Sequence, residues 1–183
     1  RVTGSAVIDL FGFVTVTGGF GVEKKTGQNL YISGAAEANV LVAGANLLTI
    51  GLSNVTAFVG FGTVGLNLTG VDLAIALWSE NVQTNPRRWT SVMGNVAGAT
   101  LAGVTGLTLT ASGVGIVVNK KASDDTVVDY VLGANETNVT ALTVATSSSA
   151  SDDVTFAIDD LNGDYVRVTG SAVIDLFGFV TVT

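Results

Sequence analysis

The sequence contains no cysteine and no histidine, and only one proline among its 183 residues. Without cysteine the chain forms no disulfide and offers no thiolate to a metal ion. Without histidine as well, it lacks the side chains most often used as general bases, nucleophiles and zinc ligands. We therefore expect a protein that is not an enzyme, although its 15 acidic residues leave paired carboxylates open as glycoside-hydrolysing groups.

Charge is scarce too, since only 13% of the residues are charged and the net charge is −7. The basic residues are few and occur at most in pairs, such as Arg87-Arg88 and Lys120-Lys121. Nucleic acid is bound by many clustered Lys and Arg side chains, so we expect no nucleic-acid partner. No apolar run reaches 18 residues, and the sequence therefore predicts no membrane insertion.

The abundant residues favour β structure. Hydrophobic residues make up 48% of the chain, mean hydropathy is +0.55, and 23 residues are glycine. Val and Thr are β-branched and favour strands, while Gly supplies turns and bends. Apolar residues alternate with small or polar ones over 14–22 and 72–77, which predicts strands with one buried side. Helix remains an alternative for 35–48 and for the segment after Thr69-x-x-Asp72, which has the form of a capping box.

The first 17 residues return unchanged at the other end of the chain. RVTGSAVIDLFGFVTVT occupies 1–17 and again 167–183, so the second copy starts 166 residues after the first. Either the polypeptide is a tandem array sampled with a short overlap, or a single unit has its first strand copied onto its end. We favour the array, in which residues 1–166 form one full unit and residues 167–183 begin the next.

A weaker likeness recurs inside the unit. Its members are GFVTVTGGFGVEKK (12–25), GLNLTGVDLAIALWSE (65–80) and GLTLTASGVGIVVNKK (106–121), with a looser fourth over 142–160. Each of the first three starts with Gly, alternates to a Thr, takes a Gly or Gly-Val step and alternates again. A unit of about 40 residues used four times would fill the 166 residues.

Two all-β architectures fit this pattern. In a β-solenoid-like continuous rod, coils about 4.8 Å apart would advance roughly 19 Å per unit of four coils. The alternative is a string of compact antiparallel β-sandwich domains, which requires linkers between units. The uninterrupted strand-like pattern from Val154 to Thr183 favours the continuous rod. Polar turns are predicted at 24–29, 79–87, 120–125 and 161–164, with Asn162-Gly163 as a type I′ turn.

The blocks GFVTVTGGFGVEKK, LTGVDLAIAL and LTLTASGVGIVVNKK…DDTVVDY resemble segments of giant tandem-repeat surface proteins of bacteria, which are secreted and often adhesin-like. The resemblance implies an extracellular or cell-surface location and a structural or adhesive role, and it supplies no catalytic residue. Relatives in that family often carry calcium-binding GGxGxD repeats, which this sequence lacks.

One segment has the spacing of a calcium loop. Asp160, Asn162 and Asp164 place oxygen ligands at i, i+2 and i+4, although the usual Gly and the distal bidentate Glu are missing. The competing interpretation is a turn flanked by solvated carboxylates. Calcium is the only cofactor that the sequence suggests.

Most aromatic residues are expected in the core, and Trp78 and Trp89 are expected to face each other across a hairpin. Arg87, next to Trp89, suggests a cation–π contact.

Taken together, these features predict a non-catalytic structural repeat of an extracellular filament or cell-surface stalk, whose partners are neighbouring copies of itself. The alternative is an adhesin module that binds glycan or a partner cell surface.

Overall fold

The computed structural model describes residues 1–34, 39–133 and 136–182, apart from the side chains of Leu10 and Asn162. The prediction of an all-β protein is confirmed, because the only helices in this described part are two 3-10 turns. The strands are β1 (Val2–Leu10), β2 (Val14–Ser33), β3 (Val40–Phe61), β4 (Val64–Ser79), β5 (Arg88–Ala102), β6 (Leu107–Lys120), β7 (Val127–Val128), β8 (Thr143–Val144), β9 (Val154–Thr155), β10 (Tyr165–Leu176) and β11 (Val180–Val182). The 3-10 turns are η1 (Ala150–Asp152) and η2 (Asp160–Asn162).

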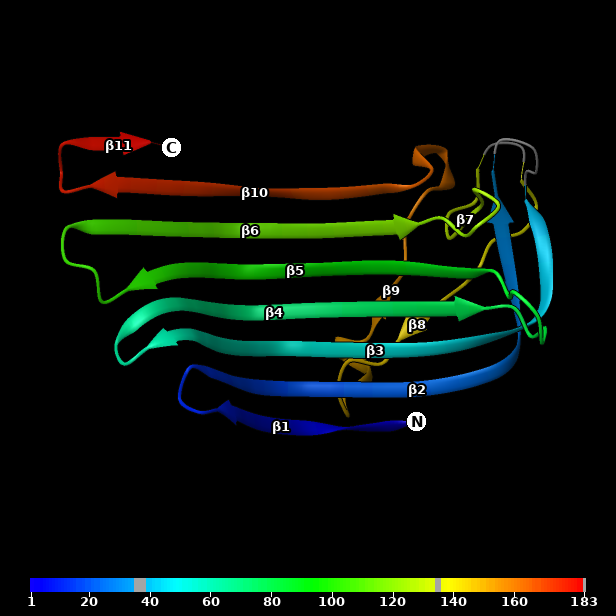
Figure 1. Cartoon of the computed structure of the whole chain (residues 1–183), viewed down its shortest axis with the longest axis horizontal. Coiled ribbons are helices and arrows are strands. Elements are labelled where there is room, and N and C mark those ends of the chain that lie inside the picture. Colours follow the sequence, from blue (N-terminus) through cyan, green and yellow to red (C-terminus); the bar gives the residue numbers. More distant parts are fainter. Residues whose placement is uncertain (35–38, 134–135, 183) are drawn as a thin grey trace.

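The long strands form one open antiparallel sheet (Figure 1). Its order is β1-β2-β3-β4-β5-β6-β10-β11, and β7 pairs separately with the end of β2. From β1 to β6 each strand lies beside its neighbour in sequence, which is the simplest connection for antiparallel strands. The chain then leaves the sheet over 121–164, which we call the crossover, and returns as β10 beside β6.

The internal likeness seen in the sequence corresponds to every second strand. The segments 12–25, 65–80 and 106–121 lie in β2, β4 and β6, which run in the same direction (Figure 1). The fourth member is different, because 142–160 lies in the crossover and contains only the two-residue strands β8 and β9. The expectation of four equivalent segments is therefore wrong for the last one, whose Ser and Asp residues form a loop with η1.

The Gly-Val steps mark a row of irregularities across the sheet. Regular pairing is interrupted at Asn54, Gly70, Ala97 and Gly113, which follow one another from β3 to β6. Three of them, all except Ala97, have positive φ, as bulge residues often do. A one-residue irregularity shifts the alternation of a strand, so the apolar positions change from odd to even numbers while staying on one face.

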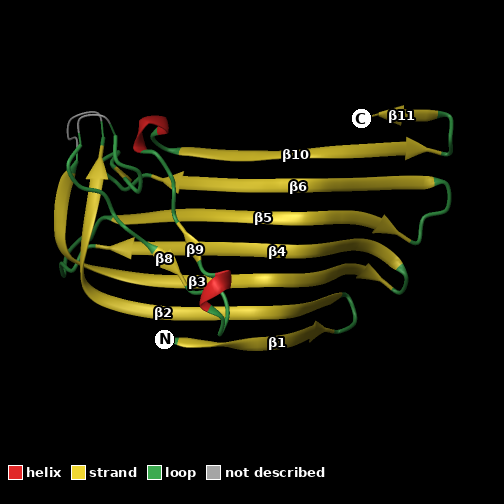
Figure 2. Cartoon of the chain, turned by 180° about the vertical axis from the view of Figure 1, so that it is seen from behind, coloured by secondary structure: helices red, strands yellow, loops and turns green. Residues whose placement is uncertain are grey.

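The two faces of the sheet have different neighbours. The crossover, with β8, β9 and η1, passes over one face at the end where β1 begins, and we call this the covered face (Figure 2). Ala74, Ala76 and Trp78 of β4 point to it and are buried. The alternate residues of the same strand, such as Ile75 and Leu77, point to the opposite face, which we call the open face, and Leu77 remains 36% exposed.

The hydrophobic core lies between the covered face and the crossover. Its members include the buried side chains Leu30, Ile32, Leu47, Trp78, Trp89, Val128, Tyr130, Val144, Phe156 and Ile158. A chain of hydrogen bonds crosses this core: the Trp78 Nε1–H donates to Tyr130 Oη (3.0 Å), which donates to Ser91 Oγ (2.9 Å). Ser91 in turn donates to the side chain of Asn119, at 3.1 Å. Every buried polar group in this chain has a partner, which fixes the aromatic side chains in place.

Trp78 and Trp89 are cross-strand partners of β4 and β5, as the sequence predicted. The predicted cation–π contact is also present, with the Arg87 guanidinium 5.3 Å from the centre of the Trp89 ring. The aromatic residues at the strand turns behave differently from the prediction. Phe11 and Phe61 are 95% and 75% exposed, because nothing covers the sheet at that end.

Of the predicted turns, 79–87 is confirmed as the connection between β4 and β5. The turn predicted at 24–29 is wrong, because β2 continues through these residues. Two register irregularities and Gly27, with φ of 68°, bend the strand there instead. The ends of β2 and β3 therefore curve past the ends of β4 to β6 (Figure 1).

The type I′ turn predicted at Asn162-Gly163 is also wrong, because Asn162 belongs to η2 and Gly163 (φ 62°) follows it as the cap. The two segments with a helical alternative are resolved as strand where they are described. Residues 40–48 belong to β3 and 69–72 to β4, while 35–38 lie outside the described residues.

Candidate functional site

The duplicated segment extends the sheet and does not form a separate element. In its second copy, β10 pairs with β6 from Tyr165 opposite Asn119 to Leu176 opposite Leu107. Because the sequences are identical, this pairing defines where β1 would lie against the β6 of a preceding copy. The β6–β10 seam is therefore the first candidate for a functional site.

Both copies fold in the same way. Ile8 pairs with Val16 in the first copy, and the equivalent Ile174 pairs with Val182 in the second. The turn repeats as well: Phe11 and Phe177 each have φ of 55°, and the glycine that follows each has φ near 70°. The Gly12 N–H donates to Asp9 Oδ1 (2.7 Å), and the Gly178 N–H donates to Asp175 Oδ1 (3.0 Å). The hairpin is thus specified by its own residues.

The outer edge of β1 is unprotected. In the described sheet β1 pairs only with β2, so one side of the strand presents unpaired N–H and C=O groups. Monomeric proteins usually blunt such an edge with proline, lysine or a covering segment. Val2–Leu10 contains neither residue and a single charged side chain, Asp9. This edge is chemically suited to pairing with another strand.

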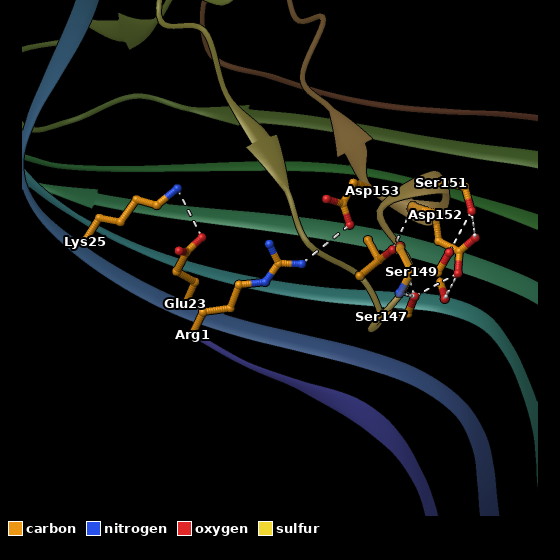
Figure 3. Close-up of polar contacts among 10 residues, drawn as sticks. Arg1, Glu23, Lys25, Ser147, Ser149, Ser151, Asp152 and Asp153 are labelled. Carbon is orange, nitrogen blue, oxygen red and sulfur yellow. Dashed lines mark hydrogen bonds and ion pairs between the residues drawn. The ribbon is translucent and has the colours of Figure 1, made fainter.

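One ion pair ties the edge strand to the crossover (Figure 3). Arg1 Nη2 lies 3.9 Å from Asp153 Oδ1, a buried oxygen that accepts no hydrogen bond from the described residues. The neighbouring loop is held by its own hydroxyl groups, since Ser147 Oγ donates to Asp152 Oδ2 at 2.8 Å. Arg167, the equivalent of Arg1, forms no ion pair within the described part of the chain.

Glycine lets the crossover lie directly on the sheet. A Cβ added at Gly21 or Gly51 would come 2.2 or 2.3 Å from the backbone oxygen of Ala145, far inside van der Waals contact. These two glycines pair with each other across β2 and β3. The crossover is therefore seated by the absence of side chains at this position.

A second candidate site is a cluster of three carboxylates. One oxygen from each of Asp129, Glu136 and Asp160 lies within 4.8 Å of the others. A cavity of about 420 Å³ adjoins Glu136 and Asp160. Oxygen ligands from three carboxylates suit a hard cation such as calcium.

The electrostatics of the cluster reflect its burial. Desolvation raises the pKa of Asp129 to about 7, and the charges of Asp160 and Glu136 raise it further against the hydrogen bond from the Val131 N–H. Burial likewise raises the pKa of Asp160, while a hydrogen bond with Ser33 acts in the opposite direction. Charge repulsion and burial both favour a proton, or a cation, among these carboxylates.

The residues of the predicted calcium loop separate in the fold. Asp160 joins the carboxylate cluster, whereas Asp164 forms an ion pair with Lys120 Nζ at 3.0 Å. The side chain of Asn162 lies outside the described part. Asp129 and Glu136 were not singled out from the sequence, because they lie 24 and 31 residues from Asp160 and share no spacing with it.

No protein-family model matches the chain, and no curated protein or solved structure is similar to it. Within the described residues, no helix is both long enough and apolar enough to cross a lipid bilayer. The arguments on function therefore rest on the geometry of the chain itself.

Proposed function

We propose that the chain is the repeating unit of an extracellular structural filament or cell-surface stalk, without catalytic activity. In this proposal successive units continue one sheet, with the first strand of each unit paired to β6 of the unit before. The observation that carries the proposal is the pairing of the second copy, β10, with β6 in a continuous register.

The geometry gives the proposal a definite repeat. The strand order places β1 through β6 between the two copies of the duplicated strand. With antiparallel strands about 4.8 Å apart, six strands would advance the rod by roughly 29 Å per unit. This favours the continuous rod over a string of separate domains, with single strands as its rungs.

The mechanical role follows from how such a rod is stabilised. Each added unit contributes a full row of backbone hydrogen bonds to its neighbour, so stability grows with the number of units. Unpaired edges then remain only at the two tips. The same arrangement would place Asp153 of the following unit beside Arg167, as Asp153 lies beside Arg1.

A chain that ends at Val166 tests the proposal, because it leaves β6 without the strand formed by the second copy. We expect this chain to polymerise head to tail, with β1 of one molecule filling the place of β10 on another. Electron microscopy should show fibres with an axial repeat of about 29 Å, against roughly 19 Å for four stacked coils.

The 17-residue peptide RVTGSAVIDLFGFVTVT provides the matched control. Added in excess it should occupy the β6 edge and stop polymerisation, whereas a scrambled peptide of the same composition should not. A truncated chain that stays monomeric and ignores the peptide would contradict the proposal.

The second candidate function is an adhesin module, and it is favoured by the aromatic side chains at the turn end of the sheet. Phe11, Phe13 and Phe61 are at least half exposed there, and the rings of Phe13 and Phe61 lie 5.6 Å apart. Exposed aromatic residues are enriched at binding surfaces. Loss of binding to a glycan array or to a cell surface on replacing all three with Ser would support this function.

A further inference from the structure

The open face of the sheet is apolar over its whole area. Residues directly opposite each other on neighbouring strands share a face, so the cross-strand register defines rows of side chains. The central row consists of Phe20, Leu52, Leu73, Gly94, Ile116 and Val168. The next row towards the crossover end consists of Val22, Ile50, Ile75, Val92, Val118 and Val166.

The apolar character continues into the turn half of the sheet. There the open face carries Val14, Val59, Leu66, Leu101 and Ile174. The row of irregularities at Asn54, Gly70, Ala97 and Gly113 is what keeps these residues on the same face as the central row. Without the shift, Thr and Asn would occupy the open face in this half. The sequence thus maintains one apolar surface across both halves.

Nothing in the described chain covers this surface. The crossover packs on the opposite face, as the burial of Ala74, Ala76 and Trp78 shows (Figure 2). A following unit of the proposed array would extend the sheet at its edge and would not lie over the face. An apolar sheet face of this size in water calls for a second layer.

The accessible area indicates how large the missing contact is. The chain exposes 10090 Å². A compact monomer of 18.5 kDa is expected to expose about 8,200 Å². The excess of roughly 1,900 Å² is the area that one partner loses in a large obligate interface.

The charges at one end select the partner and its orientation. Lys24, Arg88 and Lys120 border the open face at the crossover end, and no charged side chain of the described chain lies within it. Two copies packed with like ends together would bring these cations face to face. A two-fold axis running across the strands avoids this and places the central row of each sheet opposite the same row of its partner.

We infer that the open face is the interface with a second copy of this chain, the two sheets packing about 10 Å apart with their crossover ends pointing in opposite directions. The inference goes beyond the proposed array, because the face is complete within one chain. A filament would then consist of two arrays back to back, each with its covered face outward.

The absence of cysteine allows a clean test on the full chain, with single substitutions Leu52→Cys, Leu73→Cys and Ile116→Cys in the central row. Matched controls on the covered face are Thr17→Cys and Thr100→Cys in the uncovered half. We expect a mass of twice 18.5 kDa by light scattering, and maleimide labelling of the central-row thiols about tenfold slower than of the controls. A short bismaleimide should cross-link the central-row variants only.

A charge placed on the face tests the same inference energetically. Ile75→Lys should raise the dissociation constant of the dimer by about a hundredfold, and Thr100→Lys should leave it unchanged. Circular dichroism shows whether each variant is folded, and the Cys variants remain informative where Ile75→Lys is not.

The inference is overturned by a monomeric mass, or by central-row thiols that react as fast as the controls. Protection that appears only on adding phosphatidylcholine vesicles would also overturn it, in favour of a lipid surface. Association through the β1 and β6 edges leaves the open-face thiols reactive, so failure of this inference is distinguishable from failure of the proposed array.

Discussion

The two halves of the long strands belong to different kinds of structure. At the crossover end the sheet is one layer of two, and its covered face carries Gly, Ala and Trp under the crossover. At the turn end the same strands form a single layer, and this face carries Thr15, Thr56, Asn67 and Thr100. The comparison teaches that alternation sets which side chains share a face, while the second layer decides which of them are buried.

The largest contrast is expected from removing one aromatic side chain from each half. Trp89 is 1% exposed and its Nε1–H donates to Thr126 Oγ1, whereas Phe61 is 75% exposed. We expect Trp89→Ala to lower the free energy of unfolding by about 4 kcal/mol. Phe61→Ala should cost less than about 1 kcal/mol, from its contact with Phe13. Urea denaturation of both variants measures this, and equal losses would contradict the two-layer comparison.

The next contrast uses one substitution at two glycines. Gly51→Ala places a Cβ against the Ala145 backbone oxygen, which is fixed by the crossover. Gly115→Ala meets only the Thr169 hydroxyl, at 3.1 Å, which can rotate away. We expect a loss of about 3 kcal/mol for the first and under about 1 kcal/mol for the second. Proteolysis should also cut the crossover faster in Gly51→Ala alone.

The carboxylate cluster predicts a pH dependence that belongs to the crossover half. Because the pKa of Asp129 rises to about 7 in the folded chain, the folded state keeps a proton that the unfolded state releases above about pH 4. The free energy of unfolding should therefore fall as pH rises from about 4 to 7, by roughly 1 to 3 kcal/mol.

Asp129→Asn should remove that fall and be more stable than the parent at pH 8, where its amide oxygen can still accept from the Val131 N–H. Chemical denaturation at pH 4.5 and pH 8 separates the two chains. Millimolar calcium should raise the stability of the parent at pH 8, but not that of the variant, where the cluster holds the cation predicted from the sequence. A parent chain that gains stability as pH rises without calcium would contradict the assignment.

The smallest effect is expected at the duplicated arginines. Arg1→Ala removes an exposed ion pair of 3.9 Å and should cost at most about 0.5 kcal/mol. Arg167→Ala should have no effect in the 183-residue chain, because Arg167 has no ion-pair partner among the described residues. In a chain with one more unit the two substitutions should become equivalent, as measured by thermal unfolding. Continued inequality there would argue against the continuous seam.

Several parts of the fold were predictable because their causes are local. The turn at 79–87 follows from its polar residues and Pro86, and it places Trp78 opposite Trp89. The prediction failed at 24–29, where the same kind of polar residues lies in β2. Pairing with β3 keeps this segment extended, and the local signal alone could not reveal that partner.

The candidate site was only partly predictable. Asp160 was identified from its spacing with Asn162 and Asp164, yet its actual neighbours are Asp129 and Glu136. Asp164 lies instead beside Lys120, at the end of β6. The crossover folds back over the sheet between these residues, so no sequence spacing records their proximity.

By itself the sequence determined the β class, the repeated strand and the Gly-Val steps that shift the alternation. These features depend on backbone preferences and on residues a few positions apart. Only the tertiary structure decided which strands are neighbours, which face the crossover covers and which carboxylates meet. The physical reason is that pairing and burial join residues far apart in the chain, and the total area removed from water selects among arrangements that local preferences allow equally.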